Sequence, residues 1–191
     1  KLTRERVEVP ASSQKVSASA IFKSIFTNRA LLGIIVAAIF VLLSQLTVMS
    51  LAGYVYPNVY GSAAAQSTAS LLGTVVMLIV CAPFASKLAA KFGKKELAVA
   101  SSICSALVWL VCLIWRPASV WGFVACYILA NIGMGFFNTI IWAMITDVID
   151  DAEVRSGIRE DGTIYSVYSF ARKLGQAFSS GLVGALLGII G

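Results

Sequence analysis

The chain has 191 residues, of which 59% are hydrophobic and 13% are charged, and its mean hydropathy is +0.87. Soluble domains are about 45–50% apolar and about 25% charged, so this composition excludes an ordinary soluble domain, a disordered chain and a small disulfide scaffold. The sequence contains no histidine, which excludes His-based triads and His metal sites. The four cysteines lie in apolar runs without CxxC spacing, and we interpret them as buried small hydrophobic residues.

Residues 1–29 are polar and lack the apolar stretch of a signal peptide. We expect them to form a cytoplasmic linker that leads into the first membrane span. The segment Ser19–Asn28 carries apolar residues on one helical face. This pattern fits a short interfacial helix and equally an extension of the first span.

Uncharged runs predict five membrane crossings. No charged residue occurs from Ala30 to Ser86, a run of 57 positions. One helix of that length would measure about 86 Å against about 30 Å of hydrocarbon, so the chain must turn back. The segment Tyr56–Gly61 supplies the turn signal. The sequence therefore predicts an all-α membrane protein with spans at about 30–53, 66–86, 97–115, 120–145 and 163–191, the bundle occupying 30–191.

The basic residues predict which side of the membrane each connection occupies. Six lysines and arginines precede the first span, the first turn has none, the second connection has four, the third has only Arg116, and four lie between Arg155 and Lys173. The positive-inside rule places the N-terminus and the second and fourth connections in the cytoplasm. The net charge of +6 then reflects topology and contact with lipid, which argues against a nucleic-acid partner. The odd number of crossings leads us to expect a piece of a longer protein.

An acidic segment follows the fourth span. Six carboxylates and two arginines lie in the 16 residues from Thr146 to Asp161. If the span stays helical, three carboxylates share one face at i, i+3 and i+4. Acids at a helix C-terminus oppose the macrodipole and need a cationic partner. The acids in question are Asp147, Asp150 and Asp151, and the candidate cations are Arg155, Arg159 and Arg172. The spacing matches no EF-hand, so we assign no metal ligands; a solvated acidic loop is the simpler alternative.

Two stretches carry a family resemblance. The pattern Asp-x-x-Asp-x-x-Glu-x-x-Ser-Gly-x-Arg-x-x-Gly from Asp147, followed by Tyr165 and by Arg172-Lys173-x-Gly175-Gln176-Ala177, resembles the glycoside–pentoside–hexuronide:cation symporters of the major facilitator superfamily. The segment Pro83–Lys95, with an expected helix reversal at Gly93, resembles the short basic loop between the second and third helices of each half in that superfamily. The resemblance covers essentially the whole chain. It implies helices seven to eleven of a twelve-helix carrier, that is, five transmembrane helices of a six-helix half.

The resemblance implies a function and partners. The complete protein would import a sugar with Na⁺ or H⁺ by alternating access across the bacterial inner membrane, and it would need no bound cofactor. The cation ligands of this family lie mainly in the N-terminal half, which this chain lacks. The expected partners are therefore a sugar or glycoside, the lipid bilayer and that missing half. A gate at the cytoplasmic mouth is expected to exchange ion pairs with that half as the carrier opens and closes; its residues are Asp147, Asp150, Arg155, Arg159 and Arg172. A carrier of another solute and a truncated, non-transporting membrane module are the alternatives. We expect no catalytic residues, since the spans carry no buried pair of acids.

Polar residues inside the last span give candidate binding residues. Lys173 lies about 15 Å along the span, and a charge at that depth normally faces a polar cavity or a carboxylate. The family carries a functionally important lysine at the matching position. Snorkelling toward the cytoplasm is the alternative, and it is the preferred interpretation of Arg172, which lies about 100° around the helix from Lys173. Gln176 is expected to line the same cavity.

Polar residues on the fourth span form a stripe. Asn131, Asn138 and Trp142 fall on one helical face, at i, i+7 and i+11. Two amides and an indole could bind sugar hydroxyls and stack on a sugar ring, although core packing explains Trp142 equally well. Gln45 in the first span is a weaker candidate. Small residues in two spans are expected to allow helix backbones to approach closely. In the fourth span they are Gly133 and Gly135, for which bending is the alternative. In the last span they are Ala177, Gly181 and Ala185, together with the pair Gly184 and Gly188.

Overall fold

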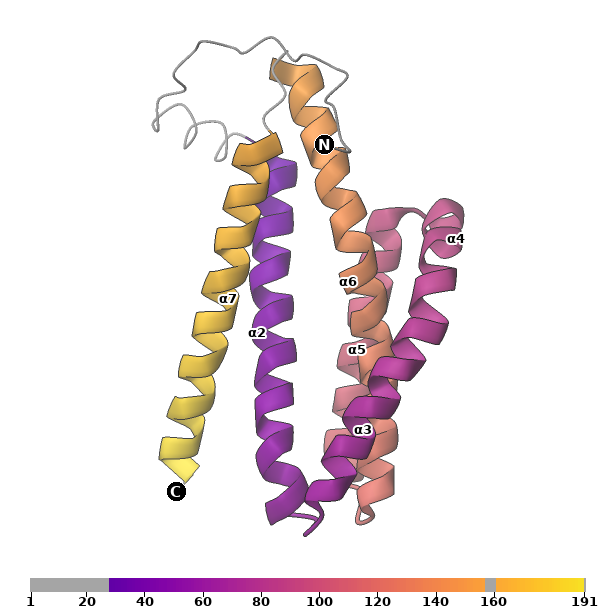
Figure 1. Ribbon diagram of the computed structural model, residues 1–191, viewed down its shortest axis with the longest axis vertical. Helices are drawn as coiled ribbons and strands as arrows, with labels where there is room; N and C mark the ends of the chain where they lie inside the picture. Colours follow the sequence, from indigo (N-terminus) through magenta and orange to yellow (C-terminus); the bar gives the residue numbers. More distant parts are fainter. Residues whose placement is uncertain (1–27, 157–160, 191) are drawn as a thin grey trace, which may run out of the picture.

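The computed structural model describes residues 28–156 and 161–190, and these residues form helices joined by short turns (Figure 1). The predicted linker and interfacial helix at 1–27 lie outside the described residues. In chain order the elements are α2 (Arg29–Asn58), α3 (Ala63–Val76), the π-helical segment η1 (Met77–Cys81), α4 (Ala82–Phe92), α5 (Lys94–Trp115), α6 (Val120–Ser156) and α7 (Asp161–Ile190).

Four helical runs among the described residues are long and apolar enough to cross a membrane. These runs correspond to the first four predicted spans, and they are Arg29–Asn58, Ala63–Phe92, Lys94–Trp115 and Val120–Val154. The second run consists of α3, η1 and α4, which form one continuous helix. The fifth predicted span is also a helix, α7 (Asp161–Ile190), but it is not among these four runs. Its crossing of the membrane stays a prediction.

The helices extend beyond the predicted spans, because charge limits the depth of a segment in the membrane and does not end a helix. α2 continues through Pro57 to Asn58, whose Nδ2 donates to the carbonyl of Tyr54 at 2.8 Å. α6 continues 11 residues past Ile145 to Ser156. The condition that the fourth span stays helical through the acids is therefore met as far as Ser156, and the alternative of an acidic loop is wrong over this stretch.

Short turns connect the helices at both ends of the bundle. The predicted reversal at Gly93 is confirmed: α4 ends at Phe92, α5 begins at Lys94, and Gly93 has φ 97°, a backbone conformation that favours glycine. At the other end, the chain leaves α5 through Arg116, with φ 45°, and enters α6 at Val120. Because these turns are tight, neighbouring helices run antiparallel and their ends are placed closely together.

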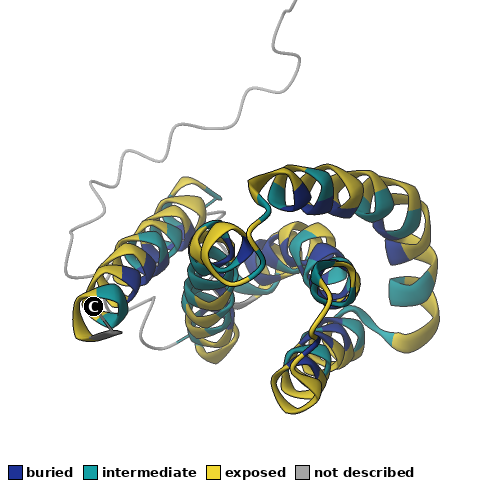
Figure 2. Ribbon diagram, turned by 90° about the horizontal axis from the view of Figure 1, so that it is seen from below, coloured by how far each residue is buried: buried dark blue, intermediate teal, exposed yellow. Residues whose placement is uncertain are grey.

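The helices form two groups. α2 packs along α7, although these are the first and last described helices, while α5 and the α3–η1–α4 helix pack on α6 (Figures 1 and 2). Contacts between the groups run mainly from α2 to α6 and α3, and the α6–α7 contact is small. Residues that connect α2, α6 and α7 therefore lie where the two groups meet.

Glycines set the closest helix approaches. A Cβ added to Gly133 on α6 would lie 2.6 Å from the Ser101 carbonyl oxygen on α5, and one added to Gly175 on α7 would lie 3.0 Å from the Ile39 carbonyl oxygen on α2. The hydroxyls of Thr47 and Ser179 also bond across α2 and α7, at 3.1 Å. The prediction of close packing at Gly133 is confirmed.

The small-residue stripe predicted on the last span does not make the contact between α7 and α2. A Cβ added to Gly181, Gly184 or Gly188 would meet nothing within 4 Å in the described part of the chain, and Ala177 is exposed. The buried residues Ala171, Gly175 and Ser179 pack instead. The predicted set and the set that packs both have four-residue spacing, so spacing alone did not show which of them faces α2.

The cysteine interpretation holds for three of the four residues. Cys81, Cys112 and Cys126 are buried and Cys104 is exposed, and all four are free thiols. Cys104 lies on a side of α5 that also exposes Ile103 and Leu107. That side has the apolar character of a lipid-facing surface, which is compatible with a small apolar thiol.

Candidate functional site

The polar stripe predicted on α6 meets α2. The half-buried Asn138 donates from Nδ2 to Oε1 of Gln45 on α2 at 3.2 Å. This bond satisfies one donor of Asn138 and one acceptor of Gln45, while each amide carries further donors and acceptors. Trp142, one turn along α6 or about 6 Å, is 45% exposed. We call Gln45, Asn138 and Trp142 the polar face.

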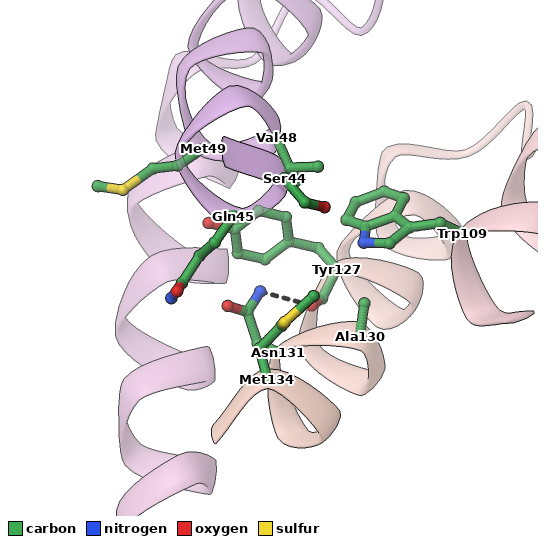
Figure 3. A pocket seen from close by; sticks show the side chains of 9 residues that line it. All are labelled: Ser44, Gln45, Val48, Met49, Trp109, Tyr127, Ala130, Asn131 and Met134. Atoms are coloured by element: carbon green, nitrogen blue, oxygen red, sulfur yellow. Dashed lines mark hydrogen bonds between the residues drawn. The ribbon is translucent and has the colours of Figure 1, made fainter. Parts of the chain in front are cut away.

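Asn131 lines a small cavity that adjoins the polar face (Figure 3). The cavity has a volume of about 50 Å³, which is room for water and too small for a sugar ring. Gln45 also lines it, and Asn131 donates to the carbonyl of Tyr127 on its own helix at 2.7 Å. The lining is completed by Ser44, Val48, Met49, Trp109, Tyr127, Ala130 and Met134.

An aromatic and cationic cluster joins α6 to α7. The Arg172 guanidinium lies 5.2 Å from the Trp142 ring centroid and 5.8 Å from that of Tyr168. The two rings contact each other edge to face, with centroids 5.6 Å apart. We call Trp142, Tyr168 and Arg172 the arginine clamp. Sequence reasoning missed Tyr168, although its position four residues before Arg172 places both on one face of α7.

The structure brings Arg172, and not Lys173, to the polar face. Lys173 is exposed and lies two positions from Gly175, so it projects from the side of α7 opposite to α2. Gln176 is half-buried and lies one turn from Arg172. The predicted set of binding residues is thus divided between two sides of α7, and the role of Lys173 stays a prediction.

An ion pair joins the start of α5 to α6. Lys94 Nζ lies 2.6 and 2.8 Å from the two carboxylate oxygens of Asp147. The cation is therefore Lys94 of the basic turn, which was not among our candidate partners. Asp150 is exposed on the next turn of α6. The Arg155 side chain and the whole of Arg159 lie outside what the structure describes, so the predicted gate stays a prediction.

The Lys94–Asp147 pair is expected to contribute little to stability. Both side chains are substantially exposed, at 40% and 57%, and exposed ion pairs contribute about 0–1 kcal/mol. In the complete carrier, Asp147→Asn should lower the free energy of unfolding by less than about 1 kcal/mol. A double-mutant cycle with Lys94→Gln measures the coupling, and raised salt should reduce it. A coupling energy above about 2 kcal/mol would show that the pair is shielded from water.

No group of three or more potential metal ligands is found among the described residues. The polar face and the arginine clamp instead supply amides, an indole and a guanidinium. These groups bind uncharged hydroxyls, planar rings and anions. Such a set is suited to holding a polar organic solute.

One family model and several known proteins match the chain. The family model described as MFS/sugar transport protein matches residues 2–191. A Bacillus subtilis protein named as the uncharacterized symporter YjmB is 32% identical over 98% of the chain and 41% of its own length. The glucuronide carrier protein homolog of Escherichia coli is 27% identical over the whole chain and 41% of its own length. Symporter YnaJ of B. subtilis, also named as uncharacterized, is 26% identical over 98% of the chain.

Two of these relatives are named as symporters and one as a carrier protein homolog. The chain spans about 41% of the length of the first two. No solved structure matches it significantly.

Proposed function

Because the chain belongs to the MFS/sugar transport protein family, we propose that it forms part of a secondary carrier that moves a glycoside, pentoside or hexuronide together with a cation. Two relatives named as symporters and one named as a glucuronide carrier homolog support this proposal. The four membrane-length helical runs supply part of the transmembrane bundle that such a carrier needs.

The polar face is the observation that carries the proposal. Polar side chains in a membrane are costly, and they persist where they bond to each other or line a cavity. Asn138 and Gln45 bond to each other across α6 and α2, with the exposed Trp142 ring one turn away. Amides beside an exposed ring can bind the hydroxyls and the apolar face of a sugar.

We place the substrate near the middle of the bilayer, between this segment and the other half of the carrier. The N-terminus, the α4–α5 turn and the α6–α7 connection face the cytoplasm of a bacterial cell, as the basic residues indicate. The cation is Na⁺ or H⁺, held mainly by the other half. The charged groups at the cytoplasmic mouth exchange ion pairs with that half as the carrier opens and closes; they are Asp147, Asp150, Arg155 and Arg159.

The test is cation-dependent uptake of labelled glycosides by the complete carrier. We expect Na⁺- or H⁺-driven uptake, and Asn138→Leu should lower it roughly 10- to 100-fold, because the variant removes amide bonds to the sugar and to Gln45. Thr139→Val is the matched control, since the Thr139 hydroxyl bonds to the Gly135 carbonyl on its own helix at 2.8 Å and its side chain is exposed.

Other outcomes would contradict the proposal in distinct ways. Uptake of another solute and of no sugar would support a different carrier of the same superfamily. Uptake that persists without an ion gradient would remove the cation from the mechanism. Transport by a membrane that contains only these 191 residues would show that no second half is required.

A further inference from the structure

Arg172 lies deep in α7 and has no acidic neighbour within ion-pair distance among the described residues. It follows Asp161, the first residue of α7, by 11 positions, or about 16 Å along the helix axis. Among the described residues, no carboxylate approaches its guanidinium within ion-pair distance. A charge at such depth needs a counter-charge or a polar cavity. The arginine is therefore a cation whose anion is not supplied by the described chain.

The arginine clamp holds this cation without using its hydrogen-bond donors. The Trp142 and Tyr168 rings lie 5.2 and 5.8 Å from the guanidinium carbon, and the side chain of Arg172 is half-buried. Aromatic rings attract the charge through their faces and leave the in-plane N–H groups available. The fork of N–H donors matches the two oxygens of a carboxylate or sulfonate.

The clamp and the polar face form one continuous surface, because Trp142 belongs to both. Asn138 precedes Trp142 by one turn of α6, about 6 Å, and bonds to Gln45. A ligand lying along this part of α6 would therefore meet amides at one end and a guanidinium at the other. Lys173 projects from a different side of α7 and does not join this surface.

We propose that Arg172, held between Trp142 and Tyr168, binds a carboxylate or sulfonate group of the transported sugar. This inference rests on the proposed function and narrows its substrate to acidic sugars. The Asn138–Gln45 pair then binds hydroxyls of the same sugar. The site selects an acidic sugar because a neutral sugar leaves the guanidinium without an anion.

The experiment compares two glycosides that differ only in the group at C6, a glucuronide and a glucoside with the same aglycone. In the complete carrier, we expect uptake of the glucuronide in preference to the glucoside. Arg172→Gln should lower glucuronide uptake roughly 10- to 100-fold and leave any glucoside uptake unchanged. Arg172→Lys should retain part of the preference, because it keeps the charge and loses the planar fork.

Lys91→Gln is the matched control, since Lys91 Nζ lies 5.2 Å from the Phe92 ring at the end of α4, the same distance as in the clamp. Uptake is divided by the amount of folded carrier in the membrane. If Arg172→Gln does not fold, the preference between the two glycosides is measured with Arg172→Lys instead.

Three results would overturn the inference. An equal loss of both glycosides in Arg172→Gln would show that Arg172 supports the helix packing. Uptake of the glucoside in preference to the glucuronide would overturn the inference and leave the proposed function standing. Uptake of neither glycoside, nor of any other sugar, by a folded carrier would overturn the proposed function and this inference with it.

Discussion

Gly133→Val is expected to destabilise the complete carrier by about 3 kcal/mol, which should lower its melting temperature by roughly 2–5 °C. A Cβ at Gly133 would lie 2.6 Å from the Ser101 carbonyl oxygen and 3.0 Å from the Ser105 Cβ. The first of these atoms belongs to the main chain of α5, so relief requires α5 and α6 to move apart. Their interface includes the buried hydrogen bond from the Ser105 hydroxyl to the Ala130 carbonyl, at 2.9 Å. The variant therefore weakens packing and a polar contact together.

Gly184→Val provides the matched control, because a Cβ at Gly184 has nothing within 4 Å among the described residues. Thermal unfolding of the two purified variants, followed by the amount of monodisperse protein after heating, compares a crowded and an open position with the same change. Similar melting temperatures for Gly133→Val and the unmodified carrier would show that α5 and α6 pack less closely than described.

Lys173→Ala is expected to lower sugar uptake by about 100-fold while the protein remains in the membrane. Lys173 lies about 18 Å along α7 from Asp161 and is exposed on the side of the helix opposite to α2. A lysine at this depth is not stable in hydrocarbon, so its partner must be water in a cavity, a group of the other half, or the substrate. Removal of the cation eliminates each of these interactions.

Lys173→Arg distinguishes a requirement for charge from a requirement for shape, since arginine keeps the charge on a bulkier planar group. Lys95→Gln, which removes an exposed cation at the start of α5, is the control for general loss of charge. Membrane-inserted protein is quantified in parallel. Full uptake by Lys173→Ala would place Lys173 at the lipid interface, where its side chain would only snorkel toward water.

The sequence predicted the helices better than their ends. The spans at 97–115 and 120–145 begin within three residues of α5 and at the first residue of α6. The length of α6 was underestimated because the predicted span ended at the first charged residues. A helix makes its backbone hydrogen bonds internally, so it can continue from lipid into water through an acidic segment. The π-helical turn at Met77–Cys81 was not predicted, since its residues have ordinary α-helical composition.

The sequence predicted most residues of the candidate site but not which of them contact each other. Helical periodicity placed Asn138 and Trp142 on one face, because that property depends on a single helix. The Gln45–Asn138 bond and the stacking of Arg172 on Trp142 depend on how three helices are rotated relative to one another. That rotation is fixed by close contacts such as Gly175 against Ile39, which spacing within one helix does not encode.

The pairing of α2 with α7 determines the order in which the protein can be assembled. The Thr47 and Ser179 hydroxyls that meet between them are separated by 132 positions in the chain. At about 5–20 residues per second, the ribosome needs on the order of 10 s to add that length. During this interval α2 lies in the membrane with its polar and small residues facing lipid or the biosynthetic machinery. Completion of this contact therefore depends on α7, the later of the two helices to be synthesised, and truncation before α7 would leave α2 without its principal neighbour.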